Sequence, residues 1–170
     1  MRNKTIIKMN YRIKLKSILA VIFGILTVNL YSQEEQHNHD HYKNELGIAN
    51  SIVYFAKEKE FAYGLHLHIV RNIHHSKFGF GVGYERIFDE HKHNTIGLVV
   101  NYSLLDDLLI SLSPGIAFEG NEFSNSKFAC SIETSYSFNV GILHLGPLLE
   151  FAYDQEDYHI SLGLHIGYGF

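Results

Sequence analysis

Residues 158–170, YHISLGLHIGYGF, alternate strictly between two kinds of side chain. Every even position from Tyr158 to Phe170 is bulky and apolar, and every odd position between them is His, Ser or Gly. Successive side chains of a β-strand point to opposite faces, so this period of two predicts a strand with one apolar face. Aromatic residues end that face on both sides, which is typical of a strand that crosses two membrane interfaces.

The same alternation recurs along the rest of the chain. Seven more segments of about eleven residues show it: 44–54, 61–71, 77–88, 94–104, 108–118, 127–138 and 142–153. This length matches the roughly 9–11 residues that a tilted strand needs to cross a membrane. The weakest copy is the first, where Asn50 interrupts the apolar face. The sequence therefore predicts eight antiparallel strands.

The glycines indicate which face points inward. Eleven of the thirteen glycines after residue 32 fall on the small or polar face of the predicted strands. The interior of an eight-stranded barrel is just wide enough for side chains to fill, so its inner wall needs small residues. A soluble β-sandwich or lipocalin-like barrel, the alternative, would turn its bulky apolar face inward. We expect an all-β fold: one closed antiparallel eight-stranded transmembrane β-barrel over 44–170.

Residues 1–32 have the layout of a secretory signal peptide. They hold six of the fourteen Lys and Arg residues and none of the eighteen Asp and Glu residues. An apolar core follows at 17–28 and is too short for a permanent membrane helix, although a retained anchor is the alternative. We expect cleavage after Ser32, which leaves a His-rich periplasmic tail at 33–43 ahead of the barrel.

Composition excludes several classes of function. After residue 32, eight Lys and Arg stand against eighteen Asp and Glu, and this acidic balance argues against nucleic acid as a partner. A single cysteine, Cys130, excludes an internal disulfide and a Cys-rich zinc module. Eight strands leave no open channel once side chains fill the interior, so we do not expect a diffusion pore.

The chain resembles the small outer-membrane β-barrel family of the OmpX and OmpA type. The resemblance rests on the signal peptide, on amphipathic strands throughout, and on the final Tyr168-Gly169-Phe170. It implies a bacterial outer-membrane protein surrounded by lipid, and recognition of Phe170 by the barrel-assembly machinery. We expect a monomer. The family shares an architecture rather than an activity and includes adhesins and lipid A enzymes.

Twelve histidines are unusual for a chain of this length. His37, His39 and His41 alternate in the tail, so in an extended chain their imidazoles could converge on one cation. His74 and His75 lie in a turn expected on the same periplasmic side and could complete the coordination. We predict these five residues as ligands for Zn, Cu or Ni, and a solvated tail with incidental histidines is the alternative.

Most other ionisable residues fall on the predicted inner face. They are His66, His68, His144, His159 and His165, with Glu45, Glu85, Glu133 and Glu150, and with Lys77 and Lys127 near strand ends. Opposite charges and hydrogen bonds inside a small barrel offset the cost of burying such groups. We interpret this set as structural filling, and a proton path or an internal metal site is the alternative. The predicted outer loop 89–93, with His91 and His93, is a weaker metal candidate.

One motif points to an enzyme. His159-Ile160-Ser161 resembles the His-x-Ser of outer-membrane lipid A deacylases, in which the serine attacks an ester. Leu162 stands where that family has Asn, and the alternation points both active side chains inward, away from lipid. We therefore predict no catalytic residue and a non-enzymatic barrel with a binding or envelope role, linked to transition-metal handling. A lipid-modifying or lipid-transferring enzyme is the alternative.

Pro114 and Pro147 interrupt the fifth and seventh predicted strands. Proline cannot donate to a β-ladder, so each is expected to mark a bulge that adjusts curvature. The alternative is a weakened seam on both sides of the sixth strand that admits a lipid laterally.

Overall fold

The structure is a computed structural model that describes residues 42–155 and 157–170. Its elements are β1 (Asn44–Phe55), β2 (Glu60–Asn72), β3 (Phe78–Phe88), β4 (His93–Leu105), β5 (Leu108–Glu119), the 3-10 helix η1 (Phe123–Asn125), β6 (Lys127–Tyr136), β7 (Phe138–Val140), β8 (Leu143–Asp154) and β9 (Tyr158–Gly169). In this part of the chain no helix is long and apolar enough to span a bilayer. The predicted signal peptide and residues 33–41 of the predicted tail lie outside the described residues.

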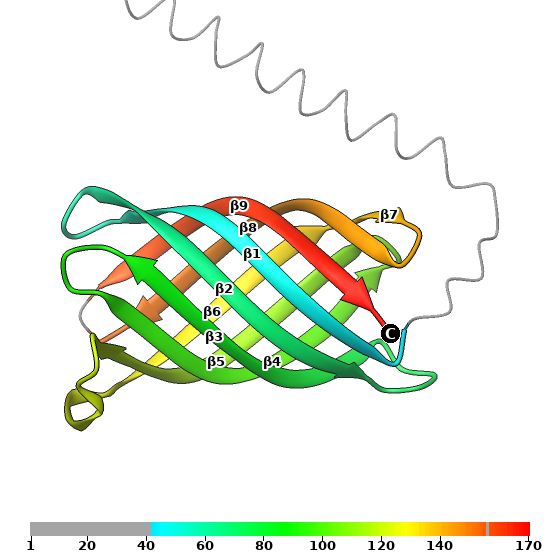
Figure 1. The fold of residues 1–170 in the computed structure, drawn as a ribbon, viewed down its shortest axis with the longest axis horizontal. Coiled ribbons are helices and arrows are strands. Elements are labelled where there is room, and N and C mark those ends of the chain that lie inside the picture. The colour runs from blue at the N-terminus through cyan, green and yellow to red at the C-terminus, as the bar shows by residue number, and fades with distance from the viewer. Residues whose placement is uncertain (1–41, 156) are drawn as a thin grey trace, which may run out of the picture. The chain divides into compact units, whose positions relative to one another are not determined.

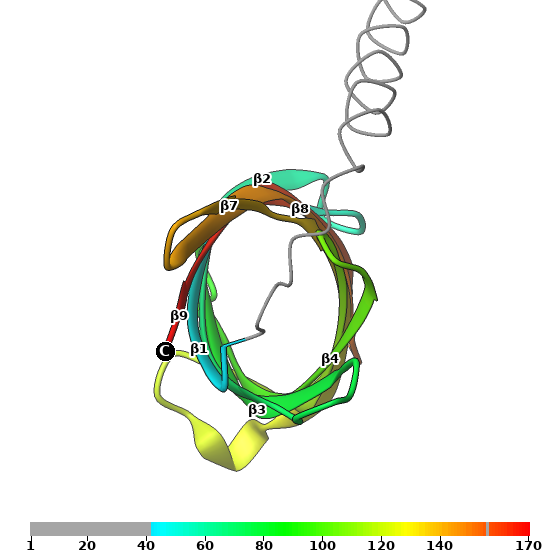
Figure 2. The same cartoon turned by 90° about the vertical axis from the view of Figure 1, so that its right-hand side faces the viewer.

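The strands close into a barrel. They pair in the order β6-β5-β4-β3-β2-β1-β9-β8-β7, and a further pairing of β6 with β8 closes the sheet on itself (Figures 1 and 2). Each pairing is antiparallel. The turns 73–77, 106–107 and 141–142 lie at the end that carries residues 44 and 170, which we call the terminal end. The connections 56–59, 89–92 and 120–126, and the residues 155 and 157 between β8 and β9, lie at the opposite end, the loop end.

The predicted sixth strand is present in two pieces, β6 and β7. The ladder from β6 to β8 ends at the pair Ser135–Leu148, and β7 resumes it at Phe138–Leu145. Pro147 lies opposite this interruption, where its missing N–H removes a ladder hydrogen bond. Nine assigned strands therefore make an eight-stranded barrel, as the sequence predicts.

Pro114 lies beside a second gap, in the ladder between β4 and β5. The pairs Gly97–Gly115 and Val100–Leu112 are formed, and no pair is formed between them. On its other side Pro114 pairs with Cys130 of β6 without interruption. Of the two weakened seams that the alternative interpretation requires beside the sixth strand, the structure therefore has the one at Pro147 and not the one at Pro114.

The outer wall is apolar and the inner wall is polar. In β9 the outward residues Leu162, Leu164 and Ile166 are 64%, 59% and 43% exposed, whereas Ser161 and His165 at the alternate positions are almost fully buried. The other strands carry exposed apolar residues of the same kind, such as Leu46, Ile52, Phe61, Phe80, Val82, Leu98, Leu112, Ile132 and Leu149. A continuous apolar belt of this size requires hydrocarbon around it, which confirms the predicted transmembrane barrel.

Asn50 is the polar residue that interrupts the outer face of β1, and a neighbouring strand satisfies it. The hydroxyl of Tyr63 in β2 donates a hydrogen bond to Oδ1 of Asn50. Because lipid offers no hydrogen-bond partner, this side-chain pair lowers the cost of an amide on the outer wall. The weakest predicted strand is therefore a regular member of the barrel.

The connection 120–126 folds against the outside of the loop end. Phe118 was expected on the exposed apolar face but is 7% exposed, because the ring of Phe123 in η1 stacks on it with a centroid distance of 4.1 Å. Asn94 on the same face is also buried, and its side-chain amide donates to the backbone carbonyl of Gly120 at 3.1 Å. The longest loop thus covers part of the outer wall that the sequence pattern alone assigns to lipid.

Candidate functional site

The interior of the barrel is acidic and rich in histidine. The predicted inner-face histidines and carboxylates all point inward, on strand positions that alternate with the exposed apolar belt. Among the inward positions of the described strands, the single Lys or Arg is Lys127, at the start of β6. Lys77 was expected near an inner strand end, but it precedes β3, is exposed, and donates to the carbonyl of Leu104 at 3.4 Å. Histidine is therefore the main inward partner available to the buried carboxylates.

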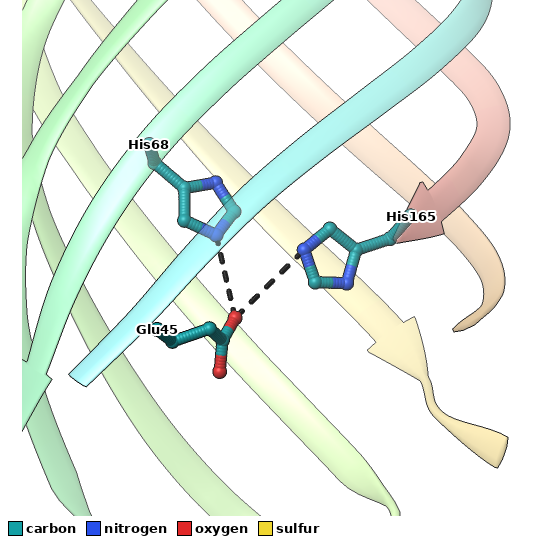
Figure 3. Close-up of side chains that lie close together, drawn as sticks. All are labelled: Glu45, His68 and His165. Carbon is teal, nitrogen blue, oxygen red and sulfur yellow. Dashed lines mark hydrogen bonds and ion pairs between the residues drawn. The ribbon is translucent and has the colours of Figure 1, made fainter. Parts of the chain in front are cut away.

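Three imidazoles converge on one carboxylate oxygen in the terminal half of the barrel. Oε1 of Glu45 lies 3.4 Å from Nε2 of His144, 3.5 Å from Nε2 of His68 and 3.9 Å from Nε2 of His165. We call these four residues the Glu45 site. They come from four strands, β1, β2, β8 and β9. Figure 3 shows Glu45, His68 and His165 pointing toward one another from their separate strands.

Glycines on the inner wall make the space for these rings. A Cβ atom at Gly47 would lie 2.1 Å from Nε2 of His68 and 2.7 Å from Nε2 of His165, and one at Gly167 would lie 2.0 Å from Nε2 of His144. These distances are far below van der Waals contact, so no larger residue fits without moving the imidazoles. The glycines that the sequence places on the small face are therefore part of the site.

The Glu45 site is poorly satisfied by hydrogen bonds alone. His165 is 1% exposed, and neither of its ring nitrogens has a hydrogen-bond partner. Nδ1 of His68 is also buried without a partner. A buried polar atom without a partner costs free energy, and native structures contain few of them. Among these atoms, Nε2 of His165 is the one that faces Glu45, at 3.9 Å, and its missing hydrogen bond is the strongest local indication that the site holds something further.

The spacing of these atoms fits a transition-metal ion. Metal–ligand bonds of 2.0–2.1 Å in a tetrahedral zinc site place ligand atoms about 3.3–3.4 Å apart. The ligand atoms of Glu45, His68 and His165 all lie within 4.8 Å of one another, and the contacts to the carboxylate are 3.5 and 3.9 Å. Small side-chain rotations would bring all three onto one ion, and imidazole suits Zn, Cu and Ni. His144 lies beside the same oxygen as a further nitrogen donor.

Two of the five predicted metal ligands, His74 and His75, lie within the described residues. His74 and His75 lie exposed in the turn 73–77 at the terminal end, as expected, with ring centroids 3.7 Å apart. His37, His39 and His41 lie outside the described residues, so a site that joins the tail to this turn stays a prediction. The Glu45 site could not be predicted among the inner-face histidines, because spacing along a strand does not reveal which strands face each other across the barrel.

The connection at 89–93 is organised by Asp89. Its Oδ2 lies 2.6 Å from Nδ1 of His93, and its Oδ1 accepts from the backbone N–H of His93 at 3.0 Å. Burial raises the pKa of Asp89, but the hydrogen bond from the His93 backbone and the nearby His93 ring outweigh it and hold the pKa below its usual range. His91 lies 3.9 Å from Glu58 and 3.9 Å from Glu119. The side chain of His91 thus lies between the connection 56–59 and the end of β5.

The enzyme-like motif lies inside the barrel. His159 is 7% exposed and Ser161 is 0% exposed, and both occupy inward positions of β9. A membrane lipid contacts the opposite, outer face of the same strand. The inward orientation predicted from the alternation is therefore confirmed.

Comparison with known proteins supports the fold. No protein-family model matches the chain, and no curated protein matches its sequence. Among solved structures, Neisserial surface protein A has 15% identity and a TM-score of 0.56, covering 75% of this chain and 96% of its own. The N-terminal β-barrel domain of OprF from Pseudomonas aeruginosa has 16% identity and a TM-score of 0.51, with coverage of 76% and 99%. The Yersinia pestis outer membrane protein Ail in a phospholipid nanodisc has 10% identity and a TM-score of 0.51, with coverage of 75% and 99%.

These identities are low, so the likeness concerns the fold. The closed sheet of this chain and the apolar belt around it indicate a membrane-spanning barrel without reference to any other protein. The chain is a small eight-stranded β-barrel of the bacterial outer-membrane type, surrounded by membrane lipid, with a histidine–carboxylate interior.

Proposed function

We propose that this protein is a non-enzymatic outer-membrane barrel that binds a divalent transition-metal ion, of the class of Zn, Cu or Ni, at the Glu45 site. The observation that carries the proposal is the convergence of His68, His144 and His165 on one oxygen of Glu45, with both nitrogens of His165 unpartnered. The site would then serve metal handling in the envelope.

Hydrogen bonding offers a weaker account of this geometry. An N–H···O bond in proteins is most often 2.9–3.0 Å long, whereas the three contacts to Oε1 are 3.4–3.9 Å. Three contacts of this length to one oxygen are long for a network held together by hydrogen bonds and ion pairs. A metal ion would instead take the carboxylate and one nitrogen from each of two or three imidazoles as direct ligands, which gives the buried Nε2 of His165 a partner.

Two features support a role without catalysis. Ser161 and His159 lie inside the barrel, away from any lipid ester, and the outer wall offers only scattered polar groups such as the Asn50–Tyr63 pair. The connections at the loop end are short, so the interior is the part of the described chain where most ionisable side chains come together. A lipid A mobility shift that depends on Ser161 would instead favour the lipid-modifying alternative.

Zinc titration of the purified mature chain in detergent tests the proposal. Three variants are compared by calorimetry: H68Q with H165Q, H74A with H75A, and H37A with H39A and H41A. We expect the first variant to lose zinc affinity by about 100-fold or more, because it removes two ligands. The other two variants should retain one zinc ion per barrel with near-native affinity.

The variants also separate the two candidate locations. If zinc binding disappears with the tail variant and survives H68Q–H165Q, the Glu45 site is not the metal site and the tail hypothesis is correct. If the chain binds no divalent metal at all, the interior is structural filling. The far-UV circular dichroism of each variant shows whether the barrel has formed.

A further inference from the structure

We infer that the barrel holds a second cation site, formed by Glu85, Glu150 and His159, which suits a harder divalent ion such as Mn²⁺ or Fe²⁺. This inference deepens the proposed function by giving the interior two sites of different chemistry, but it rests on different residues. We call these three residues the Glu150 site.

The Glu150 site lies in the half of the barrel toward the loop end. Its residues come from β3, β8 and β9, and their ligand atoms all lie within 4.8 Å of one another. All three residues are buried, with exposures of 8% for Glu85, 4% for Glu150 and 7% for His159. Three stretches that are separate in the sequence thus bring two carboxylates and one imidazole together in the barrel interior.

Several buried carboxylates around the Glu150 site would be stabilised by a bound cation. Glu150 faces Glu133 directly across the pairing of β6 and β8, and Glu133 is also buried. Three carboxylates therefore share one region, and the histidines nearby are His66, whose Nδ1 lies 3.9 Å from Glu133, and His159. Buried like charges are costly unless protons or a cation neutralise them. One divalent ion between Glu85 and Glu150 would supply that compensation.

Two further observations point to a ligand rather than to acidic filling. Nε2 of His159 is buried and has no hydrogen-bond partner. A cavity of about 30 Å³ is lined by Glu85, Glu150, His159 and His66. This volume exceeds the roughly 10–15 Å³ that one buried water needs, so an ion with one coordinated water fits.

The donor set decides the class of ion. The Glu45 site offers two or three imidazoles and one carboxylate, a set that favours Zn, Cu or Ni. The Glu150 site reverses the proportion, with two carboxylates and one imidazole, and oxygen-rich sets favour Mn²⁺ and similar ions. The two sites should therefore bind different classes of metal ion within one barrel.

Apolar packing shields the Glu150 site at the loop end. Val53, Phe55 and Ile87 are 0%, 3% and 2% exposed and form one cluster. The ring of Phe55 lies 5.3 Å from that of His159, centroid to centroid. This packing lowers access of bulk water, which strengthens the attraction between a bound cation and the two carboxylates.

Electron paramagnetic resonance of Mn²⁺ tests the second site. Manganese is titrated into the purified mature chain in detergent, and the signal of free Mn²⁺ measures how much is bound. We expect one Mn²⁺ per barrel in the native chain and at least a tenfold loss of affinity in E85Q with E150Q. The matched control is E60Q with E119Q, which removes the same charge from exposed positions at the loop end and should leave the affinity unchanged.

Variant H68Q–H165Q makes failures of the two proposals distinguishable. It should lose zinc and keep manganese, and E85Q–E150Q should do the reverse. Native-like Mn²⁺ binding by E85Q–E150Q, loss of Mn²⁺ in H68Q–H165Q, or no Mn²⁺ binding by the native chain would each overturn the second site. Loss of the proposed zinc function alone would leave manganese binding intact.

A measurement on the native chain avoids reliance on folded variants. Electron spin echo envelope modulation detects nitrogen atoms coordinated to Mn²⁺. The Glu150 site requires the signature of a single coordinated imidazole. Modulation from two or more imidazoles would place the ion at the Glu45 site and overturn the inference.

Discussion

Glu133 of β6 and Glu150 of β8 are direct partners across an antiparallel pair, and both side chains are buried inside the barrel. Like charges at directly opposed positions of a sheet destabilise it. Glu85 of β3 adds a third buried carboxylate next to Glu150. The acidic interior of the barrel is therefore unfavourable for stability in this region.

Replacing Glu133 with Gln should stabilise the barrel in metal-free buffer. The substitution removes one charge opposite Glu150 and keeps the shape of the side chain, so we expect a gain of about 0.2–1 kcal/mol in the free energy of unfolding. Urea unfolding in lipid vesicles with a chelator present measures it. The same change at the exposed Glu119 should have little effect. A lower stability of E133Q would mean that its pairing with His66 dominates.

Gly47→Ala should impair metal binding at the Glu45 site. A Cβ atom there would meet Nε2 of His68 at 2.1 Å, so the imidazoles must move away from Glu45. We expect zinc affinity to fall by about tenfold or more in calorimetry, because displaced ligands lose their geometry. Gly64→Ala is the control, since its Cβ would crowd side-chain atoms of Ser51 and Val53 at 2.6 and 2.8 Å but no histidine. Equal affinity losses in both variants would contradict the assigned role of Gly47.

Tyr63→Phe should destabilise the barrel through Asn50. Without the hydroxyl, the Asn50 amide faces lipid unpaired, and side-chain hydrogen bonds in membranes contribute about 0.6 kcal/mol on average. The measurement is again urea unfolding in vesicles. In a double-mutant cycle, Asn50→Val should remove most of the effect of Tyr63→Phe, because no polar group is then left without a partner. Additive effects of the two changes would show that the hydrogen bond contributes nothing.

Asp89 should make the connection 89–93 sensitive to acid. A carboxyl whose pKa is lowered on folding contributes stability above its unfolded pKa of about 3.9, and this stability is lost as the pH falls through the lower folded value. At neutral pH, Asp89→Asn should speed amide hydrogen exchange of His93 about fivefold, as expected for a weakened hydrogen bond worth about 1 kcal/mol.

As a control, hydrogen exchange of the His93 amide is measured in the native chain at several acidic pH values. Its His93 amide should exchange relatively faster below pH 4 than at pH 6, after correction for the intrinsic rate, whereas Asp89→Asn should show no such change. Unaltered protection in the variant at pH 6 would show that Asp89 does not hold the loop.

Much of the barrel could be predicted from the sequence. Period-two alternation predicted all eight strands, and most of their bounds agree with the structure to within one or two residues. The alternation of Leu162 and Leu164 with Ser161 and His165 also predicted which face meets lipid, because a strand has only two faces and hydrocarbon tolerates only one of them. Local pattern suffices for these features since each is a property of one strand.

Other features required neighbours that the pattern does not show. The burial of Phe118 depends on Phe123, which folds back from the longest loop, and the break at Ser137 depends on Pro147 in the facing strand. Neither could be predicted from alternation within the affected strand, since the cause lies in another segment.

For the two candidate sites as well, the sequence predicts some features and the closed sheet decides the others. Their histidines and glutamates could be assigned to the interior from strand parity alone, and glycine could be expected beside them. Which of them meet was settled by the closure of the sheet, which brings Glu45 to His144 and Glu85 to Glu150 although each pair is far apart in the chain. Convergence across a lumen depends on strand register, tilt and barrel diameter together, and these are properties of the closed sheet rather than of any one strand.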